Sequence, residues 1–419
     1  MQVLILGAGI IGLNTAYTLM QQGYQVTVLD VKNEVGQGAS FANGAQLSYS
    51  YVAPLAGPGV LGKVPKWLLD PNSPLRFRPS LKPADACWNL QFMKACNTKR
   101  SDQTTSELLK LAYLSRDLYH QLFIQEKLDV DFSSTGKLVV HRSQSSMDGA
   151  VKQLEVQRRL GAAEQFALNT QECLEREPAL AQVASQLVGG IYTPSEEAAD
   201  SYKVCLGLKA VLEAGGVQFL MKKGVRKIER QADNRVSVRL HNNETLSAEH
   251  IIVCLGVEST ALLADAGISV PVAPLKGYSL SVEIADPAHA PSVSITDFER
   301  KVVYARIGSR LRVAGMADLV GIDYRIDPQR IRALIQEAQG LFAQAGDYEK
   351  ATQWAGLRPA TPLGKPIIDK TQYRNLYLNI GHGALGLTLA TGSAHLLADL
   401  IAGRPHELSH LFNQQAAKA

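Results

Sequence analysis

The N-terminal thirty residues carry an apolar pattern that predicts a β-strand, an α-helix and a second β-strand. An apolar run at 3–6 leads into three spaced glycines, and apolar positions then recur at helical spacing until Gly23 ends the helix. A second apolar run at 25–29 ends at Asp30. A β-α-β unit of this length is what a dinucleotide-binding fold requires.

Each of the three glycines has a separate task in such a unit. Gly7 permits the tight turn, Gly9 lets a pyrophosphate approach the backbone, and Gly12 allows the helix to pack close to the sheet. Ile10 and Ile11 begin the helix, whose free N–H groups and partial positive charge favour phosphates. We therefore expect these five residues to bind a dinucleotide.

Asp30 narrows the choice of dinucleotide. It lies 18 residues after Gly12, where a carboxylate accepts hydrogen bonds from ribose hydroxyls and disfavours the 2′-phosphate of NADP. FAD or NAD is therefore expected. Two other interpretations are weaker. A plain turn does not require the whole β-α-β context, and a secretory signal peptide would begin with basic residues and lack the glycines.

Composition narrows the class of protein. The 419 residues suffice for two or three domains, and 46% hydrophobic with 20% charged residues is typical of a soluble globular chain. A net charge of +4 without basic clusters argues against nucleic-acid partners. Five scattered cysteines and nine dispersed histidines form no CxxC or HExxH motif, so we expect free thiols, a cytoplasmic location and no metal. No uninterrupted apolar run reaches eighteen residues, so no membrane-spanning helix is expected.

The rest of the chain mixes helical and strand patterns and predicts an α/β fold with α+β insertions. Strand–glycine–helix patterns return at 251–259 and 375–403, which indicates that both ends of the chain form one nucleotide domain interrupted by insertions. Helices are expected at 84–128, 147–160, 170–184, 201–214 and 328–345, and strands at 131–143, 235–256 and 274–316.

Two segments lack this periodicity. Residues 33–50 are small, polar and rich in glycine, which suits a loop lying against a cofactor. Residues 53–83 hold seven prolines, which exclude a long helix. Within them, 63–69 mixes Lys, Trp and Leu as an interfacial membrane anchor does, but an active-site lid or a surface connection explains the segment equally well.

Five motifs spread over the whole chain carry a resemblance to one family. They are GAGIIGLNTAY (7–17), GASFANGAQLSYSYVAPLAGPGV (38–60), PLKGYSL (274–280), GLRPATPLGKPII (356–368) and NIGHGALGLTLATGSAHLLADLI (379–401). With them the chain resembles the FAD-dependent amine and amino acid oxidoreductases of the D-amino acid oxidase and glycine oxidase superfamily, particularly the bacterial D-amino acid dehydrogenases. Glycine oxidase-like members place a second Arg directly after the last Gly-His. Here Gly383-Ala384 follows, which disfavours that branch.

The resemblance implies two discontinuous domains and a reaction. A Rossmann-type FAD-binding domain would comprise 1–50, 199–274 and 356–419, and a mixed-sheet substrate domain would comprise 51–198 and 275–355. The implied reaction is FAD-dependent oxidation of an amino acid to an imino acid, by hydride transfer to flavin N5, and hydrolysis to a 2-oxo acid and ammonia. A quinone or another acceptor, rather than oxygen, would take the electrons.

The resemblance also implies further FAD contacts, at the diphosphate, the adenine and the flavin ring. At the ring, the turn that opens the last helix would direct N–H groups toward the pyrimidine edge and stabilise negative charge there. The expected contacts are Ser40, Asn43, Gly44, Gln46, Val225, Gly256, Gly381, Gly383, Gly386 and Thr388.

Arg358, in the GLRP motif, is the expected partner of the substrate carboxylate, because a guanidinium forms two charge-assisted bonds to a carboxylate. Tyr278 and Tyr304 are candidates for an added hydroxyl contact, and Tyr51 and His382, with Tyr49, are weaker candidates for lining the pocket. Core packing of the tyrosines and a structural ion pair of Arg358 are the alternatives. No residue is assigned as a catalytic acid or base.

Three functions stay open at this point. The first is a D-amino acid dehydrogenase, the second the same flavin chemistry on proline-like, N-methylated or L-amino acids, and the third a non-catalytic flavin-binding subunit of a larger complex. A homo-oligomer and a peripheral contact with the inner face of the cell membrane are open as well.

Overall fold

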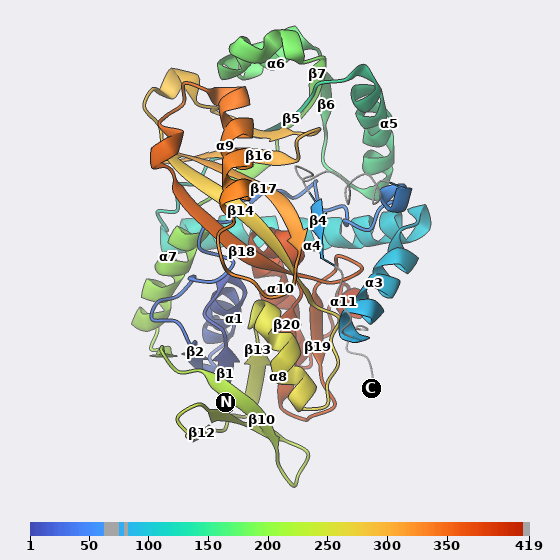
Figure 1. The fold of residues 1–419 in the computed structure, drawn as a ribbon. Helices are drawn as coiled ribbons and strands as arrows, with labels where there is room; N and C mark the ends of the chain where they lie inside the picture. Colours follow the sequence, from blue (N-terminus) through green and yellow to red (C-terminus); the bar gives the residue numbers. More distant parts are fainter. Residues whose placement is uncertain (63–74, 79–82, 414–419) are drawn as a thin grey trace.

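Two large sheets organise the molecule. A computed structural model describes residues 1–62, 75–78 and 83–413, so the expected membrane anchor at 63–69 lies outside the described residues. One sheet lies in the lower half of Figure 1 and the other in the upper half. This mixed α/β arrangement confirms the predicted fold class.

The lower sheet contains the N-terminal β-α-β unit. In spatial order its strands are β19 (Ile367–Lys370), β20 (Leu376–Ile380), β13 (His250–Val253), β1 (Gln2–Leu6), β2 (Gln25–Leu29) and β9 (Gln218–Leu220). All neighbours are parallel except β19 and β20, which are antiparallel. N-terminal, central and C-terminal stretches thus contribute to one sheet, while the bounds expected for the two domains stay a prediction.

Both faces of the lower sheet are covered by apolar cores, as is typical of a mainly parallel sheet. Val3 and Ile5 of β1 pack into one core, whereas Leu4 and Leu6 pack into the other. The first core is formed with α1 (Ile10–Gln21), α4 (Thr98–Glu126), α7 (Ser201–Ala214) and α10 (Gly386–Ile401). The second core is formed with β10 (Val225–Arg230), β11 (Val236–Leu240), β12 (Thr245–Leu246) and α8 (Ser259–Asp265).

The apolar helix α10 is part of the protein core. Among the described residues, Gly383–Ile401 is the one helical stretch long and apolar enough to cross a membrane by length and composition, and 67% of its window is buried in the protein. The Tyr119 hydroxyl of α4 donates to the Leu387 carbonyl, and Ser115 Oγ lies 2.7 Å from Thr391 Oγ1. Packing between α1 and α4 accounts for its composition.

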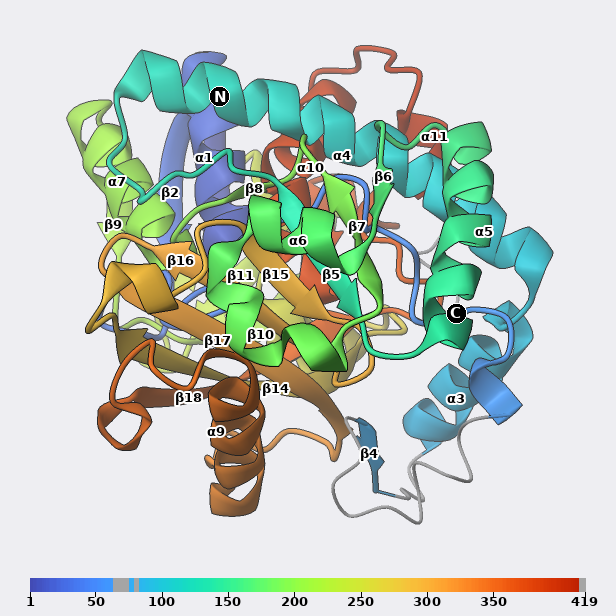
Figure 2. The ribbon, with the colours of Figure 1, turned by 90° about the horizontal axis from the view of Figure 1, so that it is seen from above.

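The upper sheet is mixed and has nine strands. In spatial order they are β18 (Thr352–Ala360), β14 (Ala273–Glu283), β17 (Arg310–Leu319), β16 (Val302–Ile307), β15 (Ser294–Asp297), β5 (Lys137–His141), β7 (Gly189–Thr193) and β6 (Phe166–Leu168), with β4 (Leu75–Phe77) beside β17. One face packs under α9 (Pro328–Phe342), α6 (Thr170–Arg176) and a 3-10 helix, Pro178–Gln186. Figure 2 shows α6 and α9 over this face. The other face turns toward the lower sheet.

Helices α3 (Pro83–Ala95) and α5 (Gln144–Leu160) lie at the outside of the molecule (Figure 1). The helix expected over 84–128 is in fact two helices, α3 and α4. The break falls at Asn97, whose side chain accepts a hydrogen bond from the Arg100 N–H and so caps α4. Two short strands, β3 (Gln46–Leu47) and β8 (Glu197–Ala198), pair with each other next to both large sheets.

Candidate active site

A cavity of about 890 Å³ lies between the two sheets and is lined by both. Every residue predicted to contact FAD or substrate lines it, except Gly12 and Tyr304. Tyr49 is also outside the lining, because it is buried and its hydroxyl donates to Glu197. The structure therefore brings together residues from both ends of the sequence.

Two of the three glycines at one end of the cavity, Gly7 and Gly12, have no room for a side chain. Gly7 has a φ of +110°, and a Cβ there would lie 2.5 Å from the Cys254 carbonyl oxygen. A Cβ on Gly12 would lie 1.9 Å from the Gly7 carbonyl oxygen. Gly12 thus acts from behind the turn, where it lets α1 approach the sheet. Gly9 precedes α1, the Ile10 N–H donates to Ser40 Oγ at 3.1 Å, and the first turn of α1 holds no acidic residue. This geometry fits a diphosphate.

Asp30 stands at the end of β2, beside the same turn. Its carboxylate accepts hydrogen bonds from the backbone N–H of Ala8 at 2.7 Å and of Lys32 at 2.9 Å. These bonds fix the carboxylate at the cavity wall, and Val225 lines the cavity at the start of β10. The arrangement fits a ribose and an adenine next to the diphosphate.

The loop at 40–46 is fixed against the upper sheet. The Ser279 hydroxyl donates to the Ala42 carbonyl at 2.6 Å, and the Gln46 amide donates to the carbonyls of Ile295 and Tyr304, both at 3.3 Å. A Cβ on Gly44 would lie 3.2 Å from Val303 Cγ2. The upper sheet therefore shapes the loop that the sequence assigns to the cofactor.

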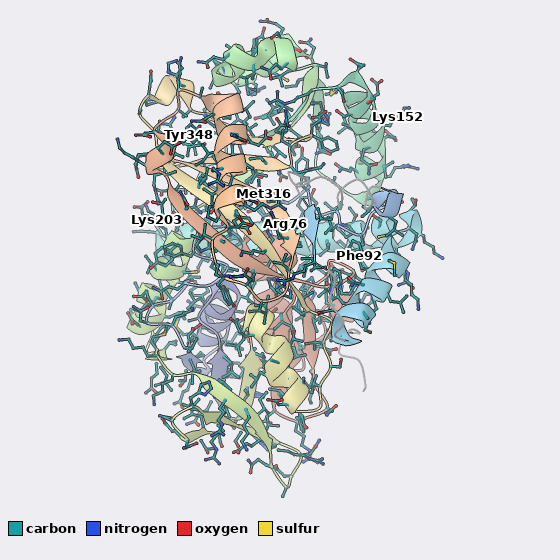
Figure 3. All side chains as sticks on the ribbon, in the orientation of Figure 1. Arg76, Phe92, Lys152, Lys203, Met316 and Tyr348 are labelled. Atoms are coloured by element: carbon teal, nitrogen blue, oxygen red, sulfur yellow. The ribbon has the colours of Figure 1, made fainter. Side chains whose placement is uncertain are left out.

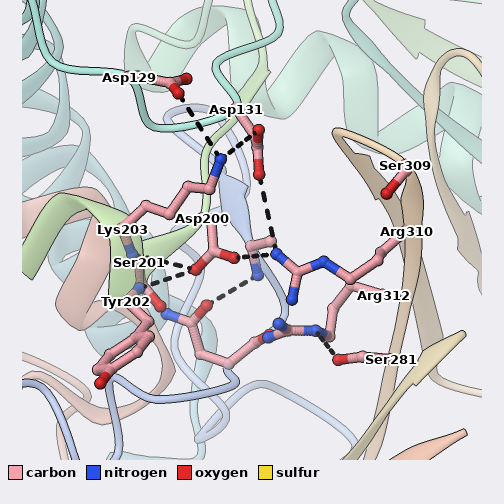
Figure 4. Close-up of polar contacts among 12 residues, drawn as sticks. Asp129, Asp131, Asp200, Ser201, Tyr202, Lys203, Ser281, Ser309, Arg310 and Arg312 are labelled. Carbon is pink, nitrogen blue, oxygen red and sulfur yellow. Dashed lines mark hydrogen bonds and ion pairs between the residues drawn. The ribbon is translucent and has the colours of Figure 1, made fainter. Parts of the chain in front are cut away.

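A buried arginine supports this loop from behind (Figure 4). Arg312 Nη1 donates to the Asn43 carbonyl at 2.8 Å, and its Nε donates to Ser281 Oγ at 3.0 Å. Burial lowers the pKa of Arg312 to about 10, whereas the negative charge of Asp200 acts in the opposite direction. Asp200 in turn pairs with Arg310 at 2.9 Å and so links α7 to β17.

The start of α10 forms the opposite wall. Gly381 and Gly383 have φ values of +80° and +57°, which permit the turn that leads into the helix. No side chain caps the helix at Leu385, and no acidic residue occupies its first turn. Thr388 Oγ1 accepts a hydrogen bond from the Ser48 N–H at 3.1 Å. The N-terminal end of this helical segment therefore lies at the cavity wall, where its partial positive charge favours an anionic group.

Arg358 presents a guanidinium to the cavity from β18. Its Nη1 donates to the Met316 carbonyl at 2.9 Å, and Met316 lies on β17 in the middle of the molecule (Figure 3). A Cβ on Gly277 would lie 2.3 Å from Arg358 Nη2, so the guanidinium rests on that glycine. No carboxylate of the described residues lies within 4.0 Å of it. Burial lowers the pKa of Arg358, against the charge of Asp318.

The two tyrosines expected beside Arg358 differ from the expectation. Tyr304 faces the upper core, where its hydroxyl donates to the Glu337 carbonyl at 3.1 Å, and it does not line the cavity. Strand alternation explains this, because Val303 takes the cavity side. Tyr278 lines the cavity, but its hydroxyl donates to Asp318 at 3.2 Å. Tyr304 therefore packs in the core, which was the alternative to its predicted role in substrate binding.

Tyr51 and His382 line the cavity as expected. The Tyr51 hydroxyl lies 2.8 Å from Thr193 Oγ1. His382 is buried, with Nε2 3.0 Å from Ser393 Oγ, and burial lowers its pKa to about 3. Its imidazole is therefore neutral at physiological pH.

Sequence reasoning missed several residues of the lining, among them Ser48, Lys137 and Gly277. Lys137 is a buried cation that lines the cavity, and it begins the strand whose other residues are apolar or buried. A single charged position in an otherwise buried strand was the available signal. The reason for a glycine at position 277, within PLKGYSL, becomes clear only from its contact with Arg358.

Three side chains of types that can bind a metal ion lie together near the end of α10, where the sequence predicts no metal site. Donor atoms of His395, Asp399 and His406 lie within 4.8 Å of one another. His395 and Asp399 lie four residues apart on α10, and His406 lies in the loop that follows. These spacings match no metal-binding sequence motif. Asp399 Oδ1 also pairs with Arg404 at 2.8 Å. The five cysteines are free.

Comparisons with known proteins agree with this geometry. A sequence model described as FAD dependent oxidoreductase matches residues 2–400. A Ralstonia nicotianae protein named D-amino acid dehydrogenase 2 is 47% identical over 414 residues, covering 96% of this chain and 97% of the relative. A Pseudomonas aeruginosa protein of the same name is 43% identical over 410 residues, covering 96% and 95%.

Among solved structures, glycine oxidase from Geobacillus kaustophilus superposes with a TM-score of 0.77 at 20% identity, covering 100% of this chain and 98% of that one. L-proline dehydrogenase from P. horikoshii superposes with a TM-score of 0.74 at 15% identity, covering 98% and 96%. These two likenesses show the fold. The family match and the relatives show more: the chain is a flavoprotein oxidoreductase that uses FAD, and it belongs to the FAD-dependent oxidoreductase family.

Proposed function

We propose that this enzyme is a D-amino acid dehydrogenase. It oxidises D-amino acids to 2-oxo acids and ammonia and passes the electrons to a quinone or another acceptor than oxygen. The observation that carries the proposal is the Arg358 guanidinium, which lines the cavity without a carboxylate partner among the described residues. A buried cation without a counter-ion is costly, so an anionic ligand is the natural partner. The names of the relatives supply the chirality.

The reaction requires an amino acid with a neutral amine. The α C–H bond breaks with its electron pair, and the amine lone pair forms the C=N bond of the imino acid. FAD, when bound, supplies the acceptor of that hydride. Water then adds to the imino acid, which releases the 2-oxo acid and ammonia. The protein has to place the substrate and stabilise the charge that builds up.

Three parts of the wall carry these tasks. Arg358 holds the α-carboxylate and so orients the α-carbon. The N-terminal end of α10 stabilises negative charge at the neighbouring wall through the partial positive charge of the helix. His382, neutral because burial lowers its pKa to about 3, offers a ring without adding charge beside the amine.

The test uses the purified chain with its flavin under anaerobic conditions. A panel of D- and L-amino acids, with proline, sarcosine and glycine, is mixed with it, and bleaching of the flavin absorbance is followed. We expect D-alanine to bleach the flavin and L-alanine not to. Air should then restore the colour slowly and a soluble quinone quickly. If only L-amino acids, proline or sarcosine bleach the flavin, that group is the substrate class in place of D-amino acids. If no compound of the panel bleaches it, a non-catalytic subunit is favoured.

The location proposed for the enzyme is cytoplasmic, with a peripheral contact to the inner membrane face. Support comes from exposed apolar side chains within the described part of the proline-rich segment, Leu55 and Leu61, and from Leu90 and Met93 on α3. A quinone acceptor would be met at that surface. Membrane fractionation at low salt tests the contact, which is abandoned if all of the protein stays in the supernatant. Light scattering of the pure protein decides whether it is a homo-oligomer.

A further inference from the structure

A second cation, Lys137, lines the same cavity as Arg358. It is the first residue of β5, pairs with Ser294 of β15 and Thr193 of β7, and is 5% exposed. Its neighbour Leu138 packs into the upper core. Because side chains alternate along a strand, Lys137 points the other way, toward the cavity.

The contacts of Lys137 within the described part of the chain include no ion pair. Its Nζ donates to Ser48 Oγ at 3.1 Å and lies 4.2 Å from the centre of the Tyr51 ring. No carboxylate of the described residues lies within 4.0 Å of it. Burial lowers the pKa of Lys137 to about 8, and the negative charge of Glu196 acts in the opposite direction.

Glu196 stands behind Lys137 and outside the cavity lining. One of its carboxylate oxygens accepts a hydrogen bond from the Ser50 N–H at 2.9 Å, and burial raises its pKa to about 7. The negative charge of Glu196 therefore favours the charged form of Lys137, although Glu196 accepts no hydrogen bond from it. The ammonium remains available to a ligand in the cavity.

The acidic residues of the cavity wall belong to its other end. The carboxylates among the described lining residues are Asp30, at the end of β2, and Glu258 and Asp265, at and near α8. All three lie on elements of the dinucleotide side. The lining contributed by the upper sheet thus includes cations but no carboxylate, so a carboxylate in direct contact with Lys137 has to come with the ligand.

We propose that Lys137 binds the side-chain carboxylate of an acidic amino acid while Arg358 holds its α-carboxylate, so that acidic D-amino acids are preferred substrates. This inference rests on the proposed dehydrogenase function and names the substrate class of that same site. The Ser48 hydroxyl and the Tyr51 ring position the ammonium, since they restrict the lysine side chain from two sides. A basic side chain would be repelled by both cations.

The test compares substrates that differ by one charge at nearly constant shape. D-glutamate is paired with D-glutamine, and D-aspartate with D-asparagine, in the anaerobic flavin-bleaching assay and in steady-state turnover with a dye acceptor. A charge-assisted hydrogen bond discriminates by about tenfold or more. We expect kcat/KM to favour each acid over its amide by that factor in the unmodified enzyme. In Lys137→Met the ratio should fall to about one, while the rate with D-alanine changes less.

The matched control is Lys152→Met. Lys152 is an exposed lysine on the outer helix α5 (Figure 3) and should leave every ratio unchanged. Lys137→Gln serves as the second variant if the methionine variant does not fold. A measurement without turnover is the change in flavin absorbance on binding glutarate or its neutral-ended analogue glutaramate. The unmodified and Lys152→Met enzymes should bind glutarate at least tenfold more tightly, and Lys137→Met should not.

The outcomes separate this inference from the proposed function. If no D-amino acid bleaches the flavin, the dehydrogenase proposal itself fails. If D-alanine bleaches it but the acids have no advantage over their amides, or keep it in Lys137→Met, only the role of Lys137 is overturned. An equal loss with every substrate in Lys137→Met also overturns it, because the lysine would then act on the flavin or on the fold.

Discussion

The dinucleotide end of the cavity is built from backbone, whereas the substrate end is built from side chains. At the dinucleotide end, Gly7, Gly9 and Gly12 lie close together in the chain, and the neighbouring backbone lies so close to Gly7 and Gly12 that no side chain fits there. At the substrate end, Arg358 and Lys137 come from β18 and β5, which lie far apart in the sequence and in the sheet.

The difference teaches how each end should respond to change. A turn in which the backbone is packed this closely is disrupted by one added methyl group, since the neighbouring backbone has no space to move into. A site made of buried charges tolerates changes of shape better, but it loses function when a charge is removed or displaced. The four predictions below test this contrast.

Gly12→Ala should have the largest effect. The added Cβ would lie 1.9 Å from the Gly7 carbonyl oxygen, so either α1 or the turn must move. We expect the protein to lose its FAD and about 3 kcal/mol or more of its free energy of unfolding. Flavin content after purification and thermal unfolding measure both.

The control for this variant is Gly149→Ala on α5, where an added Cβ meets nothing within 4 Å. It should keep its flavin and gain about 0.5–1 kcal/mol, because alanine favours a helix over glycine. A Gly12→Ala protein with full flavin content would show that the close approach of α1 is not required.

Arg358→Ala tests the other end of the comparison. Removal of the guanidinium takes away the partner of the substrate carboxylate but leaves the glycine turn untouched, so FAD should stay bound. We expect KM for a D-amino acid to rise by about a hundredfold or more, which corresponds to the loss of a buried charge pair. The KM of Arg358→Lys should lie between those of the unmodified enzyme and Arg358→Ala, because an ammonium restores the charge but cannot form the two parallel hydrogen bonds of a guanidinium.

Arg332→Ala is the matched control for the arginine. Arg332 is exposed on α9, on the far side of the upper sheet from the cavity. Its steady-state constants should equal those of the unmodified enzyme. Unchanged substrate kinetics in Arg358→Ala would remove the central support of the proposed function.

Gly277→Ala displaces the same guanidinium without deleting it. The new Cβ would lie 2.3–2.6 Å from the guanidinium atoms of Arg358, so the side chain must shift within the cavity. We expect KM to rise about tenfold with flavin content unchanged, a smaller effect than the deletion. Gly340→Ala on α9, where a Cβ meets nothing within 4 Å, is the control. Equal kinetics in both variants would mean that the position of Arg358 is not critical.

The same contrast explains which features could be predicted from sequence. The glycine turn, α1 and Asp30 are consecutive, and their task depends on local backbone geometry, so the motif predicts them directly. Arg358 was predicted through the family resemblance of its motif. The contact between its guanidinium and Gly277 could not be predicted, because it depends on the pairing of β14 with β18.

Lys137 and Tyr304 show the limit more clearly. Which residues of a strand face the cavity depends on the register of the sheet, and a shift of one residue reverses every side chain. Nothing near Tyr304 in the sequence distinguishes it from Val303, which takes the cavity side. Likewise, the donor set at His395, Asp399 and His406 exists only because the chain turns back after α10.

Tyr304→Phe should have the smallest effect of the four. Its hydroxyl donates to the Glu337 carbonyl in the upper core, away from the substrate. Loss of that hydrogen bond should lower the free energy of unfolding by about 1 kcal/mol and leave KM and flavin content unchanged. Denaturant unfolding and steady-state kinetics with a D-amino acid measure the two sides. Tyr51→Phe, at a tyrosine that does line the cavity, is the comparison. If Tyr304→Phe raised KM more than Tyr51→Phe did, the face assigned to β16 would be wrong, and with it the division of the substrate end into a core side and a cavity side.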